Sequence, residues 1–200
     1  MAELLYQGHG SFRICTAAGA VIYVDPFAGD GYDRAADLVL VTHEHYDHNQ
    51  VDLVTLKDGG KILRAADFLQ NGEDASRTEC GAEISSVAAY NKNHPKDQCV
   101  GFLVKVDGRL LYLAGDTSET EEMGTILAKE PIDYAFLPMD GVYNMGREEA
   151  ERCAAIIGAA HTVPVHMKPG ALFDEETAEA FTAEGKVIMN LPQNFGPAML

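Results

Sequence analysis

The chain has 200 residues, of which 46% are hydrophobic and 23% are charged, a balance that is typical of a folded globular protein. It carries 31 acidic and 15 basic residues, for a formal net charge of −16 at pH 7. This excess argues against nucleic acid as a partner, because no basic surface is evident to neutralise phosphates, although one or two local cations could still hold a small anionic substrate.

Short strands dominate the first half of the chain. Residues 3–7, 11–16 and 20–25 predict a β-meander with glycine-containing turns. Another strand is predicted over residues 38–42. A short helix from Val51, ended by Gly59-Gly60, and a strand at Lys61-Ile62-Leu63 follow it, and residues 66–82 can hold a short helix and a hairpin.

Strands and helices alternate in the second half. Residues 83–90 predict a strand, and residues 100–106 and 109–114 predict a hairpin because Asp107-Gly108 is a strong turn signal. The remaining elements are expected in the order helix 119–129, strand 132–138, helix 146–159, strand 163–166, helix 174–184 and strand 186–189. Residues 1–200 therefore predict one α/β domain, a four-layer αββα sandwich in which two mixed β-sheets pack face to face with helices outside.

The strongest functional signal is the stretch Thr42–His48, which places three imidazoles and the Asp47 carboxylate directly after the apolar run Leu38–Val41. His43 and His45 are two residues apart, so in an extended chain both side chains leave on the same face. Asp47 follows where the chain turns and can aim at a second point. Zinc and similar ions bind imidazole nitrogens and carboxylate oxygens, so the stretch predicts a site for two metals. A solvated His-rich loop is the alternative.

Later strand ends supply further candidate ligands. His94 lies in the loop after strand 83–90, and His166 ends strand 163–166. Asp116 follows Gly115, a residue that lets backbone and metal approach closely. The alternative for Asp116 is a cap for the helix that follows, and the alternative for His94 is a solvated loop residue.

Two more polar residues lie in turns near these strand ends. Asp25 precedes Pro26, and it either closes an Asx turn or supports a metal ligand from behind. His9 sits in a glycine-flanked turn, and we expect it to have no ligand role.

The candidate ligands in chain order are His43, His45, Asp47, His48, His94, Asp116 and His166. This pattern resembles the metallo-β-lactamase-fold hydrolase superfamily over almost the whole chain. The signature motif is matched by His43-x-His45-x-Asp47-His48, the later Asp motif by Gly115-Asp116-Thr117 and the final His motif by Pro164-Val165-His166. Ala89–Asn91, Tyr112–Thr117 and Gly141–Met145 are similar to a small cytoplasmic branch related to ascorbate-6-phosphate lactonases.

The resemblance implies a binuclear site in a metallo-β-lactamase-like domain. His43, His45 and a third histidine would hold the first metal; the second would be held by Asp47, His48 and His166, with Asp116 as the bridge. His94 is the default third histidine, because it is the only one between residues 48 and 161. However, the family's ligand usually lies nearer the strand end, where this chain has Asn91. His45 stands where the diiron branch usually has Glu, so the resemblance favours zinc and hydrolysis, with manganese or iron as alternatives.

The implied function is hydrolysis of a small cytoplasmic metabolite, a lactone, ester or phosphoester, by hydroxide formed at the metals. Asp47 would be catalytic, orienting the nucleophile and passing a proton to the leaving group. Lys168 is a candidate contact for an anionic substrate or a developing oxyanion, with a solvated loop lysine as the alternative. Asn91 and Tyr143 are candidates for substrate binding, and the alternative for Tyr143 is packing in the core. A metal-dependent nuclease or phosphodiesterase and a non-catalytic metal- or ligand-binding sensor are the alternatives.

The remaining features favour the cytoplasm. The four cysteines are widely spaced without a C-x-x-C pair, so we expect reduced thiols. Met1–Leu5 lacks a basic region and a long apolar core, so no signal peptide is expected. No run of 18 or more apolar residues predicts a membrane span.

Overall fold

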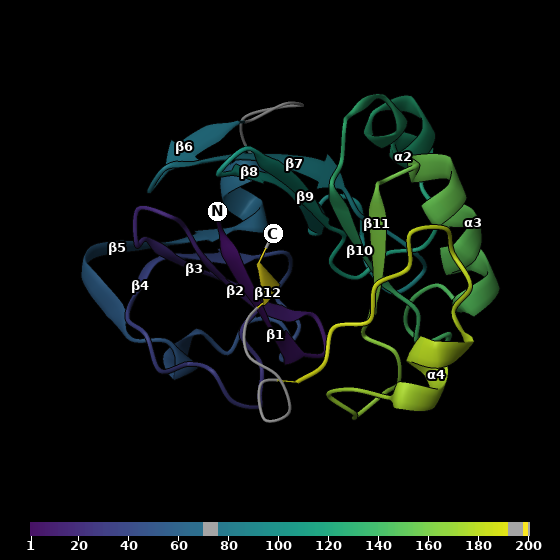
Figure 1. Cartoon of the computed structure of the whole chain (residues 1–200), viewed down its shortest axis with the longest axis horizontal. Helices are drawn as coiled ribbons and strands as arrows, with labels where there is room; N and C mark the ends of the chain where they lie inside the picture. Colours follow the sequence, from purple (N-terminus) through teal and green to yellow (C-terminus); the bar gives the residue numbers. More distant parts are fainter. Residues whose placement is uncertain (70–75, 192–197, 200) are drawn as a thin grey trace.

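The computed structural model describes residues 1–69, 76–191 and 198–199, which form two six-stranded sheets that face one another (Figure 1). The first sheet has the order β12-β1-β2-β3-β4-β5, with β1 (Glu3–Gly8), β2 (Ser11–Cys15), β3 (Val21–Val24), β4 (Ala36–Val41), β5 (Leu56–Arg64) and β12 (Ala198–Met199). The second has the order β11-β10-β9-β8-β7-β6, with β6 (Arg77–Glu79), β7 (Ala82–Ala88), β8 (Val100–Val106), β9 (Arg109–Leu113), β10 (Tyr134–Pro138) and β11 (His161–Val165).

The two sheets share one pairing pattern. In the first, β12, β1, β2 and β3 pair antiparallel, and β4 and β5 then continue in parallel. In the second, β6 to β9 pair antiparallel, and β10 and β11 continue in parallel. Both sheets are therefore mixed, as predicted. Because parallel strands end at the same edge, the loops after them gather there.

Alternation along the strands builds the core. In β4, Leu38 and Leu40 pack between the sheets, whereas Val39 and Val41 pack on the outer face of the first sheet. A strand covered on both faces has no polar side, which explains the continuous apolar run in the sequence.

Helices cover the outer face of the second sheet, on the right of Figure 1. This layer consists of α2 (Glu121–Thr125), the 3-10 helix η2 (Leu127–Lys129), α3 (Arg147–Ile157) and α4 (Glu175–Ala180). On the outer face of the first sheet, residues of the 3-10 helix η1 (Val51–Leu53) and the loop before β4 pack instead. The short helix α1 (Ala65–Leu69) contacts β5 and β7. The predicted sandwich is confirmed, with a much thinner outer layer on the first sheet.

Three predicted boundaries were wrong. Gly59-Gly60 does not end a helix but lies inside β5, where a Cβ on Gly60 would meet the Ala36 carbonyl oxygen at 2.7 Å. The helix predicted over residues 119–129 is split into α2 and η2. The strand predicted over residues 186–189 is reduced to an isolated bridge between Thr162 and Lys186. Part of the segment 66–82, residues 70–75, lies outside the described residues.

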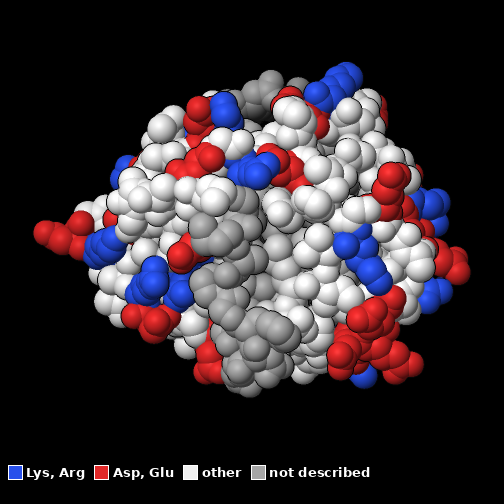
Figure 2. All heavy atoms as spheres, in the orientation of Figure 1, with Lys and Arg blue, Asp and Glu red and all other residues white. Residues whose placement is uncertain are grey.

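Charges on the face shown in Figure 2 are interspersed, and that face carries no broad basic surface. Acidic side chains gather at the lower right, where α4 lies with Glu175 and Glu176 in its first turn. None of the helices in the described part of the chain has the length and apolar character needed to span a membrane.

Candidate metal centre

The candidate ligands meet at the edge where the two sheets touch. Two backbone hydrogen bonds join the sheets there: the Val100 N–H donates to the Thr42 carbonyl at 3.0 Å, and the His166 N–H donates to the His9 carbonyl at 3.0 Å. The ends of β4, β9 and β11 and the connections β1–β2 and β7–β8 thus deliver side chains to one point.

Asp116 lies at the centre of this cluster. Its Oδ1 is 3.2 Å from His48 Nε2, and its Oδ2 is 3.3 Å from His94 Nε2. Asp116 Oδ2 also lies 3.6 Å from His166 Nε2 and 4.0 Å from His43 Nε2. The helix-cap alternative for Asp116 is wrong, because the N-cap of α2 is Thr120.

The donors fall into three overlapping groups whose ligand atoms lie within 4.8 Å of one another. The groups are His43, His45 and His94; His9, Asp47, His48 and His166; and His43, His48 and Asp116. The first two groups contain the two ligand sets that the family resemblance implies, and Asp116 joins the third.

Each of four imidazoles is oriented from behind through its other ring nitrogen. His43 Nδ1 lies 3.0 Å from Thr42 Oγ1, and His48 Nδ1 lies 2.9 Å from Asp25 Oδ2. The other two contacts are His94 Nδ1 to Asn91 Oδ1 at 2.9 Å and His166 Nδ1 to Asp140 Oδ2 at 3.1 Å. Such contacts fix the tautomer and the ring direction of histidine ligands, leaving Nε2 to face the cluster.

Asp25 supports this arrangement from behind. Its carboxylate accepts hydrogen bonds from the Thr42 N–H at 2.7 Å and the Thr42 hydroxyl at 2.6 Å, in addition to its contact with His48. Of the two expectations for this residue, the structure therefore favours support of a candidate ligand.

The cluster fits a bound cation. Among the described residues, the Nε2 atoms of His43, His48 and His166 and the Oδ1 atom of Asp116 are buried without a hydrogen-bond partner. Unpaired buried polar atoms are costly, and these four belong to one cluster. A divalent metal accepts these nitrogen and oxygen donors, so the residues present suit such an ion.

The electrostatics favour positive charge at this point. Burial lowers the pKa of His43 to about 2, so its imidazole is neutral. Burial also opposes charge on Asp116, but the charges of His48 and His166 outweigh it and hold the pKa of that carboxyl well below its usual range. Asp116 and Asp25 together outweigh burial at His48 and raise its pKa well above the usual value. A neutral His43 and an ionised Asp116 are already in the states that bind a metal, whereas His48 has to release its proton to do so.

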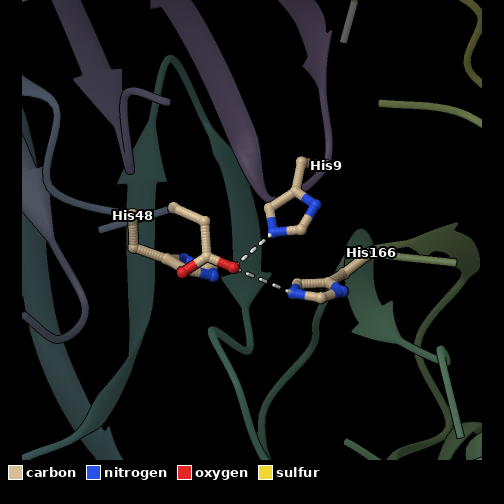
Figure 3. A group of neighbouring side chains, drawn as sticks. His9, His48 and His166 are labelled. Atoms are coloured by element: carbon tan, nitrogen blue, oxygen red, sulfur yellow. Dashed lines mark hydrogen bonds and ion pairs between the residues drawn. The ribbon is translucent and has the colours of Figure 1, made fainter. Parts of the chain in front are cut away.

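His9 belongs to the cluster, contrary to expectation. It does lie in a turn, but its side chain is buried, and its Nε2 lies 3.2 Å from Asp47 Oδ2. Figure 3 shows His9 and His166 pointing toward the same carboxylate from different elements. The two rings lie 3.6 Å apart between centroids. The signal in the sequence was the pair of flanking glycines, since a Cβ on Gly10 would meet the His48 ring at 3.0 Å.

The structure places His94 rather than Asn91 beside the first group. His94 is buried, and its Nε2 lies 3.2 Å from His45 Nδ1. Asn91 sits behind it, where the Asn91 side chain also donates to the Tyr143 carbonyl at 3.0 Å. Asn91 does not line the cavity over the cluster, whereas Asn93 does. The role of Asn91 in substrate binding stays a prediction.

A cavity of about 350 Å³ opens above the cluster. It is lined by His9, His45, Tyr46, Asp47, Asn93, His94, Asp116, Tyr143, His166, Pro169 and Gly170. Tyr143 lines the cavity, and its role in substrate binding stays a prediction. Lys168 does not line this cavity. Its ammonium lies 3.0 Å from the carboxylate of Asp174, six residues further along the chain.

Fold and site together define a metal-dependent hydrolase of the β-lactamase superfamily. Residues 3–166 match the family model described as the beta-lactamase superfamily domain, and the chain belongs to this superfamily. More narrowly, it belongs to the UPF0173 metal-dependent hydrolases. It is 33% identical over 182 residues to the member from Methanoregula boonei, covering 82% of this chain and 81% of the relative. The member from Pyrococcus furiosus is 28% identical over 222 residues, covering 96% and 97%.

Solved structures agree with this assignment. A candidate metal-dependent hydrolase from Parabacteroides distasonis superposes with a TM-score of 0.76 at 26% identity, covering 94% of this chain and 92% of that one. The metallo hydrolase Igni18 from Ignicoccus hospitalis superposes with a TM-score of 0.70 at 22% identity, covering 94% and 95%, which shows the shared fold. The narrower resemblance to ascorbate-6-phosphate lactonases stays a prediction.

Proposed function

We propose that this protein hydrolyses a small cytoplasmic metabolite, a lactone, ester or phosphoester, with two divalent cations, most simply zinc. One observation carries the proposal. Buried imidazole nitrogens without hydrogen-bond partners converge with Asp116 at the floor of a cavity that reaches solvent. Manganese and iron accept the same donors and are the alternatives.

The geometry supports a specific assignment of ligands. One cation would be held by His43, His45 and His94, which form one group of donors. The other would be held by Asp47, His48 and His166. Asp116 would bridge, because its two carboxylate oxygens face His48 on one side and His94 on the other.

Bound divalent cations supply a water of lowered pKa and polarise a carbonyl or phosphoryl oxygen. The protein's own residues would direct this chemistry. Burial raises the pKa of Asp47, but the His9 hydrogen bond and the charge of His48 outweigh it, and the pKa of Asp47 lies below its usual range. Asp47 is therefore ionised at neutral pH and able to accept a hydrogen bond from the attacking water. His9 would hold the Asp47 carboxylate in that orientation, since it donates to Oδ2 from a buried position.

Metal analysis followed by a substrate screen tests the proposal. We expect about two equivalents of zinc per chain and turnover of one class among lactones, aryl esters, thioesters and phosphodiesters at neutral pH. Asp47→Asn should lower kcat/KM by roughly 10²- to 10⁴-fold, the range for a positioned proton-transfer group. Glu83→Gln changes an exposed carboxylate that pairs with Lys105 away from the cavity, and it should leave turnover unchanged.

Two results would contradict the proposal. A stable protein without affinity for any divalent ion would rule out the metal site. A protein that binds two metals but turns over none of these classes would be a metal- or ligand-binding sensor. The described residues that line the cavity include neither Lys nor Arg, so a polyanionic nucleic acid is not the substrate we expect.

A further inference from the structure

We propose that the non-reacting part of the substrate is uncharged and carries an aromatic or similarly flat apolar group, which packs against Tyr46 and Tyr143. This inference rests on the proposed hydrolase function, since it names the substrate class of the same site. It replaces the expectation of an anionic substrate held by Lys168.

The first observation is where exposed aromatic side chains occur. Within residues 1–69 and 76–191, Tyr46 and Tyr143 are the only exposed aromatic residues, at 71% and 52% relative accessibility. Both line the cavity of about 350 Å³ above the metal-ligand cluster. Every other aromatic side chain in those ranges is buried or half-buried. Because tyrosine is usually at least partly covered, two exposed rings in one cavity indicate a surface that a ligand covers.

The second observation is that hydrogen bonds fix the main chain of both tyrosines. The Tyr46 carbonyl accepts a hydrogen bond from the Gln50 side chain at 2.7 Å, and the Tyr46 ring packs edge-on against Phe27 with centroids 5.7 Å apart. A ring presented from a fixed backbone loses little further freedom when a ligand binds.

The Tyr143 backbone is held from two sides. Its N–H donates to Asp140 Oδ1 at 2.7 Å, and its carbonyl accepts from the side chains of Asn91 and Asn93 at 3.0 Å and 3.1 Å. Asp140 and Asn91 are the groups that also orient His166 and His94. Asp140 and Asn91 thus position both the candidate ligands and the backbone of Tyr143.

The third observation is the absence of a cation in the lining. No Lys or Arg is among the described residues around the cavity. Two nearby lysines are already paired: Lys168 with Asp174 at 3.0 Å, and Lys96 with Glu122. Lys92 is exposed beside Asn93 but does not line the cavity. With a net charge of −16, the protein's overall field also opposes an anionic group held away from the metals.

Three hydroxamic acids separate the alternatives by binding rather than turnover. Their common headgroup chelates a divalent metal, so only the remainder of the molecule samples the cavity. Calorimetric titration of the zinc-loaded full chain compares acetohydroxamic acid, benzohydroxamic acid and 4-carboxybenzohydroxamic acid. We expect the phenyl compound to bind at least about fivefold more tightly than the methyl compound. The added carboxylate should remove this gain.

Variants assign the preference to the tyrosines. In Tyr46→Ala and Tyr143→Ala the ratio of phenyl to methyl affinity should fall, and in the double variant it should approach one. Ile156→Ala, an exposed apolar residue of α3 remote from the cavity lining, should keep the wild-type ratio.

Two results would overturn the inference while leaving the hydrolase intact. One is a phenyl preference that persists in the double variant. The other is tighter binding of the carboxylated compound, which would assign anion recognition to Lys92 if Lys92→Ala abolished it. Zinc content measured on the same samples separates these results from failure of the proposed function: with no zinc bound, the hydrolase and the inference that rests on it both fall.

Discussion

Asp116 is the residue on which both groups of candidate ligands converge, with one carboxylate oxygen toward His48 and the other toward His94. Asp116→Asn keeps the shape but removes the charge and one acceptor oxygen. If Asp116 bridges, this variant should lose both metals, and elemental analysis after gel filtration should find well under one equivalent. His94→Ala should weaken one metal only. Retention of one full equivalent in Asp116→Asn would show that Asp116 serves a single metal.

Asp25 tests how much the site depends on a residue that touches no substrate. Its φ of 45° is left-handed, a conformation that Asn also tolerates, so Asp25→Asn isolates the hydrogen bonds. With one acceptor oxygen the amide cannot keep all of these bonds, because the Thr42 N–H and His48 contact different oxygens of Asp25. We expect a loss of about 1–3 kcal/mol in the free energy of unfolding and a roughly 10- to 100-fold loss of zinc affinity. Urea unfolding of the metal-free protein and competition with a chromophoric chelator measure the two effects.

Asp37→Asn is the matched control for Asp25→Asn. Asp37 also accepts a backbone hydrogen bond, from the Val21 N–H at 2.7 Å, and it pairs with Lys57 at the surface. The Asp37→Asn variant should have a lower free energy of unfolding and an unchanged zinc affinity. If Asp25→Asn behaved in the same way, Asp25 would support the fold rather than the site.

At the scale of elements, the end of β9 places Asp116 through a close contact between the sheets. Gly115 has a φ of +62°, and a Cβ there would lie 2.9 Å from Thr42 Cβ and 3.0 Å from the Val100 carbonyl oxygen. Gly115→Ala should therefore force the ends of β4 and β9 apart. We expect it to lower the free energy of unfolding by about 1–3 kcal/mol more than the backbone strain alone and to reduce bound zinc.

Gly108→Ala supplies the backbone strain without the contact. Gly108 also has a positive φ, +82°, but nothing lies within 4 Å of a Cβ at that position. Gly108→Ala should lower the free energy of unfolding by about 1–2 kcal/mol and leave zinc content unchanged. Equal urea midpoints and equal zinc in the two variants would mean that the contact at Gly115 does not position Asp116.

The elements also show why part of the site was predictable. His43, Asp116 and His166 each lie within three residues of the end of an apolar strand, so the pattern that predicts the strand also locates the ligand. His9 was missed because its burial comes from the other sheet, through the hydrogen bond between its carbonyl and His166. The glycines beside His9 indicate a close approach but do not identify the partner. The pairing of Lys168 with Asp174 was equally hard to predict, since it depends on how one loop folds back.

Over the whole molecule, the two sheets repeat one pairing order, and equivalent strand ends carry comparable groups. Asp25 follows β3 in the first sheet, and Asp116 follows β9 in the second. The sequence predicted two mixed sheets but showed no repeat, because the shared pattern lies in strand order and hydrogen bonding rather than in residue identity. The lining of the cavity was even harder to predict from the sequence, because Tyr46 and Tyr143 come from opposite halves of the chain and share a cavity only in the folded protein.

Since the candidate ligands come from both sheets, bound metal should hold the sheets together. The first sheet's turns supply His43 and His48, and the second sheet's supply Asp116 and His166. Removing metal should therefore lower the free energy of unfolding. The expected loss is about 2.7 kcal/mol for each site if the loaded protein was in free metal at a hundred times its Kd. Urea unfolding of zinc-loaded and chelator-treated protein at pH 7.5 measures the difference.

The same difference should depend on pH with a defined sign. Metals bind deprotonated imidazole, and the pKa of His48 lies well above its usual value in the metal-free protein, so a proton on His48 competes with zinc already near neutral pH. The stabilisation by zinc should therefore shrink progressively from pH 7.5 toward pH 5. A zinc effect that stayed constant from pH 7.5 to 5 would contradict ligation by histidine. Hydrogen exchange shows which part of the protein zinc stabilises. Without zinc, amides at the ends of β4 and β9 should exchange faster, whereas the exchange of amides in the hairpin of β6 and β7 should not change.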